Sequence, residues 1–101
     1  MVDINTLVRQ AKEMQNRVRI AQEELAKVEI EGEAGGGLVK VTMTGAKAVR
    51  RVAIDDKTMD DKDTLEDLLA AAFNNAKDRA DEIATATMEE ATGGMDLPAG
   101  L

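Results

Sequence analysis

Four polar side chains near the start of the sequence recur at steps of three or four residues. They are Arg9, Lys12, Asn16 and Arg19. At this spacing they form one ridge along a helix, here called the basic ridge. A row of cationic and amide donors suits the phosphates of duplex DNA, which such side chains bind without reading base sequence. The other interpretation is a solvated helix face, because charged residues are common there.

Five further basic residues are secondary candidates for binding phosphates. They are Arg17, Lys40, Lys47, Arg50 and Arg51. The last four lie in residues 38–54, which hold no acidic residue, whereas residues 55–101 hold 4 basic and 13 acidic residues. The formal net charge of -7 opposes phosphate binding. This uneven distribution nevertheless permits a basic surface on an acidic protein.

The sequence lacks the complete patterns of a catalytic, metal-binding or phosphate-loop site. The sequence has no cysteine and no histidine, which excludes the usual zinc sites and nucleophile–base pairs. No Gly-Lys-Ser or Gly-Lys-Thr follows Gly35–Gly37, so these glycines predict a turn and not a phosphate loop. Residues 55–66 have a calcium loop's length, but Lys57 and Met59 occupy ligand positions. The adjacent carboxylates there lack other catalytic group types. We predict no catalytic residue, no metal site and no cofactor.

The helix that carries the basic ridge is predicted from an apolar stripe on another face. The stripe spans four heptads: Ile4, Leu7, Ala11, Met14, Val18, Ala21, Leu25 and Val28. It predicts a helix of roughly 25 residues, with Asp3 as its N-cap. The stripe either covers the protein's own sheet or forms a coiled coil between subunits. Both are packing roles.

The middle of the chain predicts a three-stranded antiparallel sheet. Its first strand begins near Val28 and ends at the glycine run, and residues 38–44 and 48–55 form the second and third. Arg50 and Arg51 are adjacent, so they point to opposite faces of a regular strand unless a bulge intervenes.

A second long helix is predicted over residues 62–88, with Asp60 or Asp61 as its N-cap. It carries a broad apolar stripe that suits a sheet or an interface. The stripe consists of Leu65, Leu68, Leu69, Ala72, Phe73, Ala76, Ala80 and Ile83. Residues 1–91 therefore form a single α+β domain, and residues 92–101 are predicted to be a flexible tail.

Composition sets the remaining expectations. The chain has 101 residues, enough for one small domain, and Phe73 is its only aromatic residue. An aliphatic core of this size favours self-association. No run approaches the ~18 apolar residues of a membrane span. With no signal pattern at the start and no cysteine, we expect a cytoplasmic protein without membrane contact.

Several segments, in this order, resemble the YbaB/EbfC family of bacterial nucleoid-associated proteins. They are Met14-Gln15, Gln22–Leu25, Gly32–Thr42, Gly45, Arg50–Asp55, Leu65–Leu68, Ala71–Ala76 and Gly94–Gly100. The resemblance covers nearly the whole chain. It implies a tweezer-like homodimer whose sheets form the central body and whose long helices are arms that contact duplex DNA. No reaction is implied. Many relatives begin with a Gly- and Lys-containing segment and end with more basic residues, both of which this sequence lacks.

From the resemblance we expect a nucleoid protein that binds duplex DNA with low sequence specificity and affects nucleoid organisation and transcription. Without aromatic residues beyond Phe73, stacking on single strands is not expected. The alternative is a non-catalytic dimeric adaptor whose acidic helices bind a protein partner, such as a basic DNA-processing protein. The charge of residues 55–101 favours that alternative.

Overall fold

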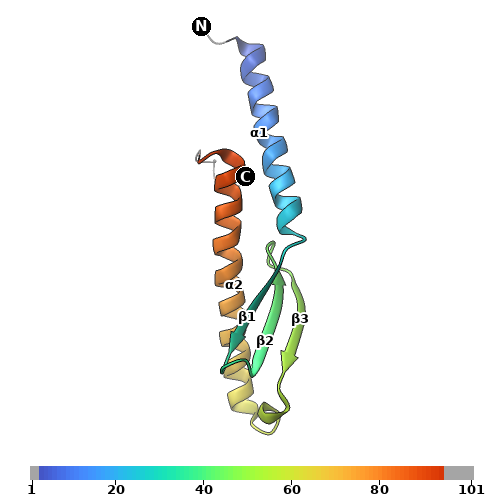
Figure 1. The fold of residues 1–101 in the computed structure, drawn as a ribbon, viewed down its shortest axis with the longest axis vertical. Coiled ribbons are helices and arrows are strands. Elements are labelled where there is room, and N and C mark those ends of the chain that lie inside the picture. Colours follow the sequence, from blue (N-terminus) through green and yellow to red (C-terminus); the bar gives the residue numbers. More distant parts are fainter. Residues whose placement is uncertain (1–2, 95–101) are drawn as a thin grey trace.

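The protein is an elongated molecule of 70 × 19 × 18 Å in a computed structural model that describes residues 3–94. Its elements in chain order are α1 (Ile4–Leu25), β1 (Glu29–Ala34), β2 (Val39–Thr44), β3 (Val49–Ile54), the 3-10 turn η1 (Asp56–Thr58) and α2 (Lys62–Thr92). The predicted α+β architecture is confirmed. The sheet packs on the first half of α2, and α1 extends away from the sheet beyond the end of α2 (Figure 1).

Both helices begin where the sequence predicts. The Asp3 side chain accepts a hydrogen bond from the backbone N–H of Asn5 at 3.3 Å, and Asp61 accepts one from Thr64 at 3.1 Å. The helix α1 ends at Leu25, three residues earlier than predicted. The N–H of Lys27 bonds to the carbonyl of Glu24 at 3.0 Å, which tightens the last turn, and the carbonyl of Val28 accepts the Gly45 N–H at 3.1 Å. The helix α2 continues to Thr92, four residues further than predicted. Residues 95–101 of the predicted tail lie outside the described residues.

The three strands form the predicted antiparallel sheet in the order β1-β2-β3. A left-handed backbone at Gly35–Gly37 makes the turn between the first two strands. In β2, Thr42 pairs with Arg51 and Met43 with Val49, which leaves Arg50 as the extra residue of a β-bulge. The two arginines are therefore not on opposite faces of a regular strand.

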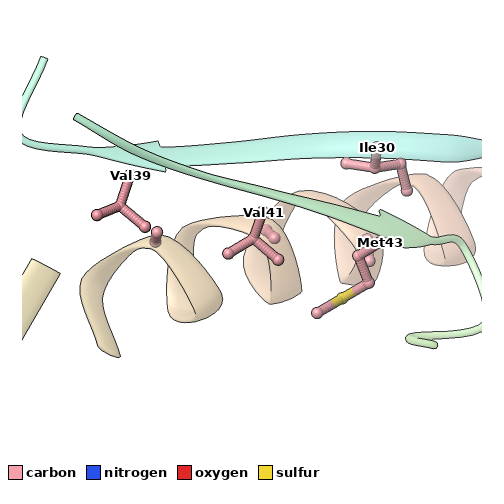
Figure 2. Close-up of a cluster of buried hydrophobic side chains, with 7 residues drawn as sticks. Ile30, Val39, Val41 and Met43 are labelled. Atoms are coloured by element: carbon pink, nitrogen blue, oxygen red, sulfur yellow. The ribbon is translucent and has the colours of Figure 1, made fainter. Parts of the chain in front are cut away.

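The core lies between the sheet and α2. Ile30, Val39, Val41 and Met43 extend from the strands toward the helix (Figure 2). There they meet Ala72, Ala76 and Ala80, which are fully buried. The small alanine face brings α2 close to β1, and Gly32 makes this approach possible because a Cβ there would lie 2.3 Å from the backbone nitrogen of Ala76. Phe73 only borders this aliphatic core and is half-buried.

The apolar stripe of α1 does not cover the sheet, so that interpretation was wrong. Its last members, Ala21 and Leu25, are buried, and this end of α1 packs against α2. Toward the N-terminus Met14 is half-buried, and Leu7 and Ile4 are exposed. The physical reason is length, because α2 ends before it reaches the first half of α1 (Figure 1).

Candidate nucleic-acid interface

The first half of α1 is an arm that projects beyond α2. The end of α2 lies level with Arg17 and Glu24, which line a groove together with Thr87 and Glu90 of α2. Arg9 is eight residues before Arg17, a distance of about 12 Å along the helix axis. The N-terminal part of the basic ridge therefore lies on the projecting arm.

The structure brings three members of the basic ridge together. Arg9, Lys12 and Asn16 line one shallow groove along α1 with Glu13. Within residues 3–94 neither Arg9 nor Lys12 is in an ion pair, and both side chains are exposed. These two cations are therefore available to phosphate oxygens.

The fourth ridge residue is already engaged. One terminal nitrogen of Arg19 donates to Glu23 Oε1 at 2.8 Å, and the other donates to the side-chain oxygen of Asn16. The pair is solvent-exposed, so it contributes little stability and phosphate can compete for it. Before DNA binds, the positive charge of Arg19 is therefore partly neutralised by Glu23, unlike the charges of Arg9 and Lys12.

The acidic face of α2 is separated from the arm. Residues 77–92 carry two basic and five acidic residues, and this half of the helix runs beside the C-terminal half of α1 (Figure 1). At physiological ionic strength the Debye length is about 8 Å. The roughly 12 Å from Arg17 to Arg9 exceeds that length, so the negative field of α2 is weakened at Arg9.

Two secondary candidates are held by carboxylates. Lys47 Nζ lies 2.7 Å from Asp81 Oδ1, and Arg51 lies 3.8 Å from Glu29 across the sheet. The hydrogen bond from Lys47, followed by that from Lys77, keeps the pKa of Asp81 below its ordinary value of 3.8. Lys47 and Arg51 thus take part in contacts between elements of the protein itself.

The other secondary candidates do not extend the arm. Lys40 lies opposite Glu33 in the register of β1 and β2, near the turn between these strands and at the end of the sheet remote from α1. Arg50 is exposed at the bulge, and Arg17 faces the groove toward α2. The nine predicted residues therefore form two groups, one on α1 and one distributed over the sheet.

Two side chains that the sequence analysis did not single out close one edge of the sheet. Arg79 Nη1 donates to the carbonyl of Glu31 at 2.9 Å, and Asn75 accepts the backbone N–H of Glu33 at 3.0 Å. Both protect the outer edge of β1 from pairing with another strand. Their partners are 48 and 42 residues away, so no local spacing reveals them.

Fold and side-chain placement together define a small α+β protein with a projecting helical arm on which Arg9 and Lys12 are exposed. The model of the YbaB/EbfC DNA-binding family matches residues 1–95, and the chain belongs to that family. Its fold is also similar to the crystal structure of the uncharacterized protein HP0035 from Helicobacter pylori, with a TM-score of 0.78 and 22% identity over 85% of this chain and 92% of that one. Neither helix within residues 3–94 has the length and apolar character to cross a membrane.

Proposed function

We propose that this protein is a non-catalytic nucleoid-associated protein that binds duplex DNA as a homodimer with low sequence specificity. Membership of a DNA-binding family supports the nucleic-acid partner. The observation that carries the mechanism is the position of Arg9 and Lys12, exposed on an arm that extends beyond the acidic helix. Through such binding the protein would reside on the nucleoid in the cytoplasm and influence its organisation and transcription.

Low specificity follows from the chemistry of the arm. Arg9 and Lys12 form charge-assisted hydrogen bonds with phosphate oxygens, which are the same along every duplex. Asn16 adds a neutral donor, and Arg19 joins once phosphate displaces Glu23. Two arms from a homodimer would hold one duplex between them with contacts on both sides.

An uncovered part of the sheet supports the homodimer. Val49, Val52 and Ile54 pair with the core residues of β2 and face the same side of the sheet, yet all three are exposed because α2 lies over β1 and β2. Asn75 and Arg79 close the β1 edge, while the described residues place no comparable side chain on the β3 edge. Sheet edges and apolar faces of this kind associate.

The occupant we assign to this face is α2 of a second copy. Asn75 and Arg79 reach the β1 edge, so helical geometry places Phe73 on the opposite flank of α2, toward β3. The half-buried ring of Phe73 and the exposed Val52 and Ile54 then form one apolar surface. A second α2 on this surface would complete the burial of all three residues.

The test of DNA binding is fluorescence anisotropy with two unrelated duplexes over a salt series. A dimer with two phosphate contacts per arm predicts a slope of log affinity against log salt of about -3.6, from four contacts at about 0.9 each. We expect similar slopes for both duplexes, since phosphate carries no base information.

Charge-matched variants then locate the contact. The double variant Arg9→Glu with Lys12→Glu should abolish binding and leave dimerisation unchanged. Lys57→Glu with Lys62→Glu changes the net charge equally at the opposite end of the molecule and should leave binding nearly intact. Equal loss in both double variants would show that net charge and not the arm governs binding. Unchanged binding in the first would move the contact elsewhere.

The adaptor hypothesis rests on a separate surface. Glu82 and Glu89 line a shallow depression on the C-terminal half of α2 with Asp81. Asp81 forms ion pairs with Lys47 and Lys77, whereas Glu82 and Glu89 form no ion pair within the described residues. Absence of DNA binding even at low salt would favour a basic protein as the partner of this face.

A further inference from the structure

The arm carries an apolar row that no other described part of the chain covers. Its members occupy the a and d positions of the heptad repeat: Ile4, Leu7, Ala11 and Met14. The exposed fraction of the residue is 74% at Ile4 and 51% at Leu7, and the neighbouring Val8 is 47% exposed. The same row is buried further along the helix at Ala21 and Leu25, where it meets α2. Clustered exposed apolar residues on a regular helix mark an interaction surface.

We propose that this row pairs in an antiparallel coiled coil with α1 of a second copy, so that two proteins join arm to arm. When each a position faces a d position, Ile4 packs against Met14 of the partner subunit and Leu7 against Ala11 of the partner subunit. The same four residues then supply both sides of the contact. The surface is therefore self-complementary in shape.

The flanking charges select this orientation. Asp3, Gln10 and Arg17 occupy the g positions. In the antiparallel register Asp3 lies opposite Arg17 of the partner subunit at both ends of the contact, and the Gln10 side chains meet at its centre. A parallel pair would instead place Asp3 beside Val8 of the partner subunit and leave both charges without an opposite charge.

Arm pairing leaves the basic ridge accessible. Arg9 and Lys12 occupy f and b positions, on the side of α1 away from the a and d row. A joined pair of arms would present both ridges outward, so two dimers could contact separate stretches of duplex while joined. The assembly depends on apolar burial and not on DNA, so it can form or fail independently of the function proposed above.

Sedimentation velocity of the full chain without DNA, over a range of protein concentrations, tests the surface. Leu7→Glu should abolish assembly beyond the dimer that forms through the sheet, because it places a charge between the paired arms. Leu7 is exposed in the single chain, so the substitution should not disturb folding. Asn5→Glu adds a negative charge only two residues from Leu7 but on the opposite side of the helix, at the outward-facing b position, and should assemble like the unmodified protein. Equal assembly by Leu7→Glu and unmodified protein, or no assembly by either, would overturn the proposal.

Engineered thiols test the register, since the sequence contains no cysteine. Disulfides require Cα atoms about 4.4 to 6.8 Å apart. A mixture of the Leu7→Cys and Ala11→Cys proteins should therefore cross-link severalfold more than either protein alone. Cross-linking of Ala11→Cys alone to the same extent as the mixture would indicate parallel or random contact and contradict the proposal.

Discussion

The close approach of β1 to α2 can be tested with a single methyl group. A Cβ added at Gly32 would lie 2.3 Å from the nitrogen and 2.6 Å from the Cα of Ala76. Both are backbone atoms, so no side-chain rotation relieves the collision. Ordinary contact begins at 3.4 Å, so the helix and strand must separate by about 1 Å.

The expected cost of Gly32→Ala follows from that displacement. Over-packing costs about 1 to 3 kcal/mol, and we expect about 3 kcal/mol because a whole helix must move away from the valines of β2. The backbone of Gly32 is not left-handed, so no conformational strain contributes. Gly36→Ala is the matched control, because Gly36 has a φ of 67° and nothing within 4 Å. It should cost only about 1 to 2 kcal/mol, from left-handed strain alone.

Urea unfolding followed by circular dichroism at constant protein concentration measures both losses. The unfolding free energy of Gly32→Ala should fall more than that of Gly36→Ala. If Gly32→Ala lies within about 0.5 kcal/mol of the unmodified protein, as harmless surface changes do, the tight contact between β1 and α2 is refuted. A larger loss in Gly36→Ala than in Gly32→Ala would have the same meaning.

Two further variants probe the dimer and the electrostatics. Phe73→Ala should cost about 3 to 5 kcal/mol if a second copy completes the burial of the ring, and roughly half as much in a single chain. Urea unfolding across a range of protein concentrations separates these values, and a neutral effect would contradict the packing of Phe73. Asp81→Asn should lower stability at neutral pH because it removes the partner of Lys47 and Lys77. Since folding lowers the pKa of Asp81, the difference in stability from the unmodified protein should persist above pH 3.8 and vanish as the pH falls further. Thermal melts from pH 7 to pH 2 measure this difference, and a constant value across the range would contradict its origin in Asp81.

Local features of the fold could be predicted from the sequence because their causes are local. Asp3 and Asp61 precede helices and bond to backbone groups two and three residues away. The glycine run supplies the left-handed residues that the β1–β2 turn requires. The sequence allowed either a regular strand or a bulge at Arg50 and Arg51. It could not decide between them, because a bulge depends on the pairing of β3 with β2.

The placement of α1 could not be predicted in the same way. A heptad stripe indicates that a helix packs against something, and it is equally compatible with a sheet, another helix or a second subunit. What decides the outcome is that α2 ends at Thr92, level with the middle of α1. The capture of Lys47 by Asp81, 34 residues later in the chain, is likewise a consequence of tertiary structure.

An acidic chain can present a basic surface only if its charges are far apart relative to the screening length. At about 0.15 M salt the Debye length of ~8 Å is shorter than the roughly 12 Å between Arg9 and Arg17, so Arg9 acts locally, whereas Lys12 is about 7.5 Å from Arg17 and lies at the limit of the field of α2. At about 0.01 M salt the length grows to ~30 Å, close to the ~33 Å span of α1, so the carboxylates of α2 act on the same phosphates. The salt series proposed above should therefore be linear near physiological salt and flatten at low salt. A protein with evenly distributed positive charge would instead continue to gain affinity at low salt. Curvature in the plot of log affinity against log salt therefore indicates that the arm separates the positive from the negative charges.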